Sequence, residues 1–192
     1  MQDCGNKNPA AGNGLAAKEV KAMNKTIFLI GFMGAGKSTV AQELKKRLGF
    51  PVVEMDARIA EQEGMSIPDI FEKKGEPYFR KLETELLESF TADAPAIVSC
   101  GGGAAMREEN VAAMHRGGVT VLLKASPETI LERVKDNDDR PLLRGKKNTS
   151  DIQKLMDQRY PKYEAAADIA VDTSGLTVSE VCDAILSELD KM

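Results

Sequence analysis

The sequence has few of the features that mark secreted, membrane-spanning or nucleic-acid-binding proteins. Its 192 residues include only three cysteines, widely spaced and without a CxxC pair, so neither a disulfide framework nor a zinc or thiol-exchange motif is indicated. No apolar run approaches the roughly 20 residues that cross a bilayer, and no charged-then-apolar leader opens the chain. The 26 Lys and Arg do not outnumber the 30 Asp and Glu, which argues against a nucleic-acid surface. We therefore expect a cytoplasmic protein with no membrane or nucleic-acid partner.

The composition and the alternation of short apolar runs indicate an α/β protein. Residues 1–22 are rich in Gly, Asn, Ala and Lys and are expected to form a flexible N-terminal extension or leader, followed by a single domain over residues 23–192. The runs TIFLI, VVE, AIVS, VTVLL and IAV alternate with amphipathic helical patterns. This alternation predicts parallel βαβ units in a three-layer domain with a five-stranded sheet. The polar interval over residues 136–150 is too long for a tight turn and is interpreted as a lid.

The stretch GFMGAGKST, Gly31 to Thr39, matches the phosphate-binding pattern G-x-x-x-x-G-K-[ST]. It directly follows TIFLI and precedes the helical pattern STVAQELKKRL, which is the context that the pattern requires. Backbone N–H groups of such a loop face phosphate oxygens, and side chains at Gly34 and Gly36 would obstruct that approach. Lys37 is expected to neutralise phosphate charge, and Ser38 to offer its hydroxyl to Mg²⁺. The alternative is a glycine-rich turn with a solvated lysine. The motif predicts nucleoside triphosphate binding without naming an acceptor.

Two charged pairs are candidates for selecting the acceptor. Glu54 and Asp56 stand two residues apart at the end of the second strand, on one face if the segment is extended. One carboxylate there can hold a magnesium-bound water and the other a substrate hydroxyl, or Asp56 can simply cap the next helix. Arg80 is expected on the first turn of the helix after Gly75, with Glu83 on the same face. The pair is either a surface ion pair or a device in which Glu83 orients Arg80 toward a substrate carboxylate.

Three further segments carry candidate binding groups. The third strand runs into Gly101–Gly103, and three consecutive glycines indicate a backbone that a ligand approaches closely. Cys100 lacks an arginine six positions later, so a phosphatase-like nucleophile is disfavoured and a packed thiol is expected. Arg140 of RPLL, in the lid, is either solvated or closes over the transferring phosphate. Arg159 either packs its stem against Tyr163 or binds substrate.

The set as a whole resembles a shikimate kinase. The matching segments are GFMGAGKST, Asp56 of EMD, GEPYFR with Glu83, CGGG, RPLL and RYPKYEAAA, in that order and at comparable intervals from Met23 to the C-terminus. The resemblance implies a nucleoside-monophosphate-kinase-like P-loop fold with a parallel sheet of order 2-3-1-4-5. It also implies ATP-dependent phosphorylation of the shikimate 3-hydroxyl, giving shikimate 3-phosphate and ADP, in the chorismate pathway of aromatic amino-acid biosynthesis. One departure is Glu54, where the family usually has the first Asp of Asp-x-Asp.

The resemblance further implies a role for each site residue. The catalytic residues would be Lys37, Asp56 and Arg140. ATP would be bound by Gly34, Ala35, Gly36, Lys37, Ser38, Thr39, Arg133 and Arg140, with Arg133 lying against the adenine base. Shikimate would be bound by Asp56, Arg80, Gly101, Gly102, Gly103 and Arg159. Ser38 would ligate Mg²⁺, with Glu54 reaching it through a water. Asp56 would orient the attacking hydroxyl and accept its proton.

Two other functions fit parts of this pattern. A kinase of the same architecture that acts on gluconate or a nucleoside monophosphate shares the loop and the lid, but it need not combine Arg80, the glycine triplet and Arg159. A nucleotide-dependent switch shares the loop but predicts no acceptor-stimulated ADP production. No obvious exposed apolar helix face is present in the sequence pattern, so a monomer is expected.

Overall fold

The computed structural model describes residues 25–91, 94–134 and 148–192. The expected extension over residues 1–22 therefore lies outside the described residues, and so do Arg140 and most of the expected lid. Thr149 and Ser150, the last two residues of that interval, belong to the first turn of helix α7 (Thr149–Ala166).

Five parallel strands form one sheet, as the sequence pattern predicts, in the order β2-β3-β1-β4-β5 that the resemblance implies. The strands are β1 (Thr26–Ile30), β2 (Val52–Glu54), β3 (Ile97–Ser99), β4 (Gly118–Lys124) and β5 (Ile169–Asp172). β1 is central, with Ile27 opposite Ile97 of β3 on one side and Val119 of β4 on the other. All five residues of β1 are buried. A parallel strand covered on both faces reads as a continuous apolar run, which is why TIFLI is recognisable in the sequence.

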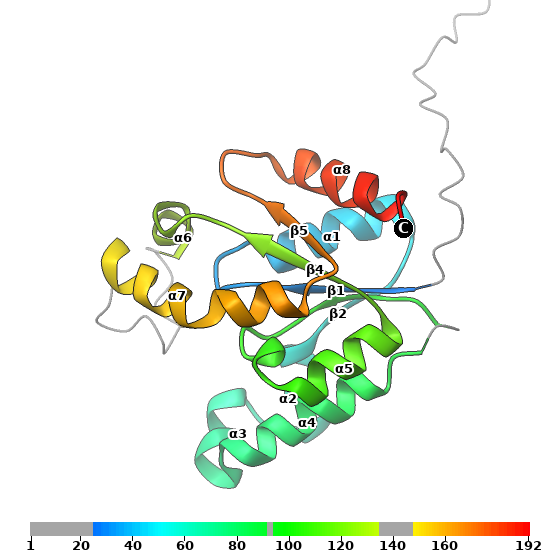
Figure 1. The fold of residues 1–192 in the computed structure, drawn as a ribbon. Helices are drawn as coiled ribbons and strands as arrows, with labels where there is room; N and C mark the ends of the chain where they lie inside the picture. The colour runs from blue at the N-terminus through cyan, green and yellow to red at the C-terminus, as the bar shows by residue number, and fades with distance from the viewer. Residues whose placement is uncertain (1–24, 92–93, 135–147) are drawn as a thin grey trace, which may run out of the picture.

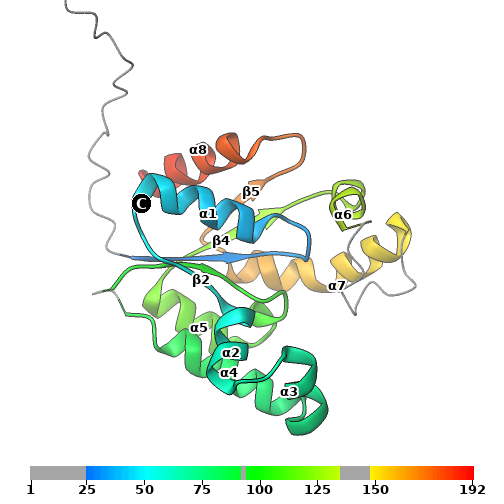
Figure 2. The ribbon, with the colours of Figure 1, turned by 180° about the vertical axis from the view of Figure 1, so that it is seen from behind.

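Helices cover both faces of the sheet (Figures 1 and 2). One face carries α1 (Lys37–Leu48) and α8 (Val178–Leu189), and the other carries α4 (Glu76–Glu88), α5 (Glu108–Gly117) and α7. The remaining helices are α2 (Met55–Glu63), α3 (Ile67–Lys74), the 3-10 turn η1 (Ala104–Met106) and α6 (Pro127–Val134). In both views α3 lies farthest from the sheet and packs on α4. No helix in the described ranges combines the length and the apolar character needed to cross a bilayer.

Helix boundaries follow the capping signals in the sequence. Ser66 precedes α3, and its Oγ accepts the Asp69 backbone N–H at 3.2 Å. Thr177 and Glu180 form the expected capping box of α8. Gly75 separates α3 from α4 with a φ of 83°, a value that suits glycine. These local signals fix where the helices begin, and packing on the sheet then fixes which faces they bury.

Two local expectations are wrong. Glu54 and Asp56 do not share a face of an extended segment, because α2 begins at Met55 and buries that side chain completely. Asp56 lies in the first turn of α2, and Glu54 rather than Asp56 is the N-cap residue. Arg80 lies in the second turn of α4, because the helix begins at Glu76.

Candidate active site

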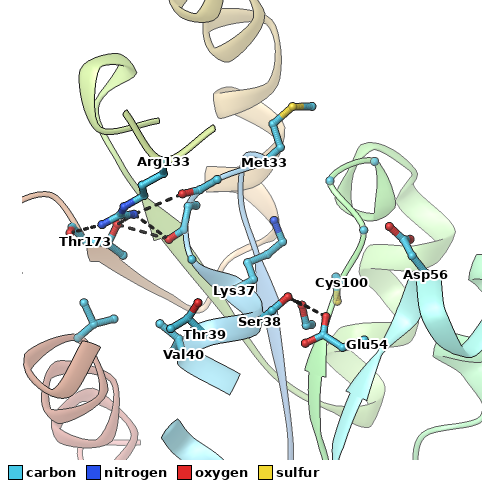
Figure 3. A pocket seen from close by; sticks show the side chains of 18 of the residues that line it. Met33, Lys37, Ser38, Thr39, Val40, Glu54, Asp56, Cys100, Arg133 and Thr173 are labelled. Atoms are coloured by element: carbon cyan, nitrogen blue, oxygen red, sulfur yellow. Dashed lines mark hydrogen bonds between the residues drawn. The ribbon is translucent and has the colours of Figure 1, made fainter. Parts of the chain in front are cut away.

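A cavity of about 800 Å³ lies where the carboxyl ends of the strands meet the loops that follow them (Figure 3). This edge of a parallel sheet is where α/β proteins usually bind ligands. In Figure 3, Lys37 stands in the middle of the cavity, with Arg133 and Thr173 on one side and Asp56 on the other. The predicted residues that line it are Gly34, Ala35, Gly36, Lys37, Ser38, Thr39, Glu54, Asp56, Arg80, Gly101, Gly102, Gly103, Arg133 and Arg159. Every described site candidate therefore borders one space.

The phosphate loop joins β1 to α1. Gly34 has a φ of 79°, and a Cβ placed there would lie 2.8 Å from Val134 Cγ1 of α6. Glycine at this position is therefore required by the approach of α6 as well as by the backbone conformation. Lys37 Nζ donates to the carbonyls of Gly31 at 2.9 Å and Phe32 at 3.1 Å. These bonds hold the ammonium group over the loop, next to the N-terminus of α1, so both positive features face the same part of the cavity.

Oxygen atoms from three segments meet beside the loop. Ser38 Oγ donates to Glu54 Oε2 at 2.9 Å and lies 3.4 Å from Ser99 Oγ at the end of β3. The other carboxylate oxygen, Glu54 Oε1, is buried and has no hydrogen-bond partner among the described residues. A buried carboxylate oxygen without a partner is costly unless a ligand, an ion or a water satisfies it. The described residues contain no group of three or more acidic, His or Cys side chains that would enclose a metal by themselves.

On the far side of the cavity, Asp56 and Glu83 approach the glycine triplet. A Cβ at Gly101 would lie 2.9 Å from Asp56 Oδ1 and 3.1 Å from Glu83 Oε1. A Cβ at Gly103 would lie 2.7 Å from the Arg80 Nη1 atom. Side chains at the two outer positions of the triplet would therefore displace the Asp56 carboxylate and the Arg80 guanidinium, which lie against the backbone there. At Gly102 an added Cβ would make only ordinary contacts.

Arg80 is held between two carboxylates of its own helix. Its Nη1 donates to Glu83 Oε2 at 2.7 Å, and its Nε and Nη2 donate to Glu76 Oε1 at 3.0 and 2.7 Å. The Glu83 side chain is 1% exposed, so the surface ion pair considered from the sequence is excluded. Burial raises the pKa of Glu83, while the hydrogen bond from Arg80 lowers it. Three of the five guanidinium N–H groups are used, and two remain for a ligand.

Arg159 of α7 lines the same cavity as Arg80. Its Nη1 donates to the Gly102 carbonyl at 3.3 Å, and the Tyr163 hydroxyl donates to the same oxygen at 2.6 Å. The guanidinium carbon lies 6.0 Å from the centre of the Phe32 ring. Tyr163 is buried, and burial raises the pKa of its hydroxyl. Tyr163 thus holds the Gly102 carbonyl, and the one bond from Arg159 to the same oxygen leaves most Arg159 donors for a ligand.

Arg133 of α6 lies on the nucleotide side of the cavity (Figure 3). Its Nη1 donates to Thr173 Oγ1 at 3.1 Å and, at 3.4 Å each, to the carbonyls of Gly34 and Ala35. Its Nη2 donates to the Thr173 carbonyl at 3.2 Å. The guanidinium therefore connects α6, the phosphate loop and the segment after β5.

Cys100 has the packing role expected from the sequence. It is 2% exposed, and burial raises the pKa of its thiol. A protonated, buried thiol is a poor nucleophile.

Sequence reasoning missed Ser99, Thr173 and Arg107. Ser99 ends β3 and Thr173 directly follows β5, positions visible only once the strand boundaries are known. Arg107 lines a second cavity of about 620 Å³ together with Arg80 and Arg159. Arg107 forms an ion pair with Glu109, two residues along the chain. No sequence motif marks Arg107.

Three comparisons agree with this geometry. The family model described as shikimate kinase matches residues 33–190. The chain is 42% identical over 165 residues to a shikimate kinase of Persephonella marina, covering 86% of this chain and 99% of the relative. The solved shikimate kinase of Acinetobacter baumannii, in complex with shikimate, has a TM-score of 0.78 at 32% identity over 88% of this chain and 96% of its own. That of Aquifex aeolicus has a TM-score of 0.73 at 42% identity over 86% and 96%.

Proposed function

The chain belongs to the shikimate kinase family, and we propose that the cavity described above transfers the γ-phosphoryl group of ATP to the 3-hydroxyl of shikimate. It is a kinase of the shikimate pathway by this membership, and the proposal concerns which residues perform the reaction. The observation that carries the proposal is the convergence of Asp56, Arg80 and Arg159 on the same cavity as the phosphate loop. Monomeric state and cytoplasmic location remain predictions.

The donor half of the site is the phosphate loop. Gly34 to Thr39 would surround the ATP phosphates with backbone N–H groups, and the N-terminus of α1 would add positive potential. Lys37 would exchange its bonds to the loop carbonyls for the β- and γ-phosphate oxygens and stabilise the charge that develops there during transfer. Arg140, outside the described residues, is the further cation proposed for this role.

A divalent cation fits the donor half. The Ser38 hydroxyl and the unpartnered Glu54 Oε1 are hard oxygen donors next to the loop, and Ser99 adds a third oxygen within reach. Mg²⁺ favours such ligands and normally keeps several waters, completing its shell with substrate phosphates rather than with a protein cage. We propose that Ser38 ligates Mg²⁺ directly and that Glu54 holds one of its waters. When bound, the cation supplies positive charge to the phosphate oxygens.

The acceptor half is formed by Asp56, the glycine triplet and two arginines. Arg80 and Arg159 have N–H donors that remain for the shikimate carboxylate, which a guanidinium binds in a two-bond geometry. Asp56 would accept a hydrogen bond from the attacking hydroxyl and take its proton as the phosphoryl group is transferred. With both partners fixed, orientation and charge stabilisation supply most of the rate acceleration.

Substitution of Asp56 by Asn tests the acceptor half. The amide keeps the shape but cannot take the proton, so we expect turnover to fall by about 10²- to 10⁴-fold. The dissociation constant of ATP should change less than about twofold, because Asp56 lies across the cavity from the loop. Steady-state kinetics and calorimetric titration of ATP measure the two quantities.

Asp190→Asn is the matched control. Asp190 is exposed at the end of α8 and does not line the cavity, so its variant should keep wild-type kinetics. Wild-type turnover together with wild-type shikimate KM in Asp56→Asn would refute the assignment of Asp56.

A further inference from the structure

Arg133 contacts the phosphate loop from the nucleotide side of the cavity. Its Nη1 and Nη2 atoms point in the guanidinium plane toward Thr173 and toward the carbonyls of Gly34 and Ala35 (Figure 3). The side chain has no ion-pair partner among the described residues. Among the described residues its hydrogen bonds go to backbone carbonyl and hydroxyl oxygens.

Thr173 provides a rigid anchor for these bonds. It is 2% exposed, and its backbone N–H donates to the Lys124 carbonyl at the end of β4 at 2.8 Å. Its hydroxyl and its carbonyl accept from different nitrogens of Arg133, at 3.1 and 3.2 Å. Because the guanidinium is planar and forked, these two bonds fix its orientation as well as its position.

The consequence for the loop follows from peptide geometry. In a trans peptide the C=O and the following N–H point in opposite directions. An Ala35 carbonyl turned toward Arg133 therefore leaves the Gly36 N–H directed away from Arg133. Gly36 is the residue before α1, and its N–H belongs to the set that faces the phosphates. The two bonds to the loop are long, at 3.4 Å each, but they carry the charge of the guanidinium.

We propose that Arg133, anchored by Thr173, is a positioning residue for the phosphate loop: it orients the Ala35–Gly36 peptide and strengthens triphosphate binding, independently of any contact with the adenine base. The inference rests on the proposed function only in that the loop binds ATP. The N–H donors of Arg133 bond to Thr173 and to the loop carbonyls in the plane of the guanidinium. The flat face of the guanidinium therefore stays available to stack on the adenine base. A role toward adenine and a role toward the loop are thus separable by choice of ligand.

The ligand that separates them is magnesium tripolyphosphate, which has the phosphate chain of ATP and no base. The variants are Arg133→Lys, which keeps the charge but loses the fork, and Thr173→Val. The second removes, at nearly constant volume, a hydroxyl that accepts from Arg133 and itself donates to the Ala35 carbonyl at 3.5 Å. Calorimetric titration gives the dissociation constants of ATP and of magnesium tripolyphosphate for each. Arg116→Lys, an exposed arginine near the end of α5, is the matched control.

We expect both variants to weaken tripolyphosphate by about 5- to 50-fold, and ATP by at least a similar factor, as for the loss of charge-assisted hydrogen bonds. The shikimate KM at saturating ATP should stay within about twofold of wild type, which a general loss of structure would not allow. Tripolyphosphate affinity within about twofold of wild type in both variants would overturn the proposal, and so would a wild type that binds ATP but no tripolyphosphate. A wild type that binds both but does not phosphorylate shikimate would instead refute the proposed function.

Discussion

At the scale of single residues, the site depends on arginines whose charge is only partly neutralised by the protein. Arg80 is bonded to Glu76 and Glu83, and its guanidinium carbon lies 5.4 Å from the centre of the Phe79 ring. These contacts fix the orientation of the guanidinium before any ligand arrives, which lowers the entropy lost on binding. The cost is a carboxylate, Glu83, buried beneath the substrate site.

Glu83→Gln tests how far the buried Glu83 carboxylate lowers the free energy of unfolding. The pKa of Glu83 is raised in the folded protein, burial being the largest cause and Arg80 opposing it. A raised pKa contributes stability below the ordinary pKa of Glu, and this contribution is lost as pH rises through the folded value. Gln resembles the protonated form, so the free energy of unfolding of the variant, relative to wild type, should increase between pH 4 and pH 7. The increase is about 1.4 kcal/mol for each unit by which the pKa is raised.

Urea unfolding at both pH values measures this difference. The variant should at the same time raise the shikimate KM, because Arg80 loses the charge-assisted bond that fixes the orientation of its guanidinium. A relative free energy of unfolding that decreases from pH 4 to pH 7 would mean that the Arg80 pair outweighs burial.

At the scale of elements, α2 carries Asp56 and α4 carries Arg80, and α3 packs against both helices. A three-residue cluster joins these helices. Lys74 Nζ of α3 lies 2.6 Å from Glu63 Oε2 of α2, and the Tyr78 hydroxyl of α4 donates to both Glu63 oxygens at 3.2 Å. Because α2 carries Asp56 and α4 carries Arg80, the cluster sets the spacing between the two acceptor-binding groups.

Lys74→Met tests the cluster. We expect the shikimate KM to rise about 2- to 10-fold, the ATP KM to stay unchanged, and the melting temperature to fall by about 1–3 °C. The hydrogen bond from Lys74 is the main reason that the pKa of Glu63 is lowered, so the effect on stability should be present above the ordinary Glu pKa and vanish as pH falls through the lowered value.

Lys73→Met is the matched control on the same helix. Lys73 is 61% exposed and lies 3.9 Å from Asp69, so its pair should contribute little. Equal changes of shikimate KM in both variants would show that the cluster has no specific role.

The elements were the part of the fold most accessible to sequence reasoning. β1 and α1 were predicted because a buried parallel strand and a phosphate-loop helix each leave a strong local pattern. The positions of Asp56 and Arg80 within their helices were missed by a few residues, because helix starts depend on cap geometry. The burial of Glu83 depends on how the helices pack, and the contact between Arg133 and Thr173 joins residues 40 positions apart. No local sequence pattern encodes either feature.

At the scale of the whole molecule, the sheet brings donor and acceptor groups from distant segments to one edge. The phosphate loop follows β1, Glu54 ends β2, the glycine triplet follows β3 and Thr173 follows β5, so four strand ends contribute to a single cavity. The order β2-β3-β1-β4-β5 puts the strand that leads to Asp56 on one side of the loop and the strand that leads to Thr173 on the other. The architecture itself therefore separates an acceptor side from a nucleotide side.

The central claim is that this cavity is a shikimate-phosphorylating site, and acceptor-dependent ADP release tests it most directly. The purified full chain is assayed with ATP, Mg²⁺ and either shikimate, gluconate, AMP or no acceptor, and the product is identified by phosphorus NMR. Shikimate has the ring carboxylate for Arg80 and Arg159 and a hydroxyl for Asp56, whereas AMP has no carboxylate. We predict ADP and shikimate 3-phosphate in equal amounts with shikimate, and only background ADP otherwise. Faster ADP release with gluconate or AMP, or a rate with shikimate equal to that without acceptor, would contradict the account.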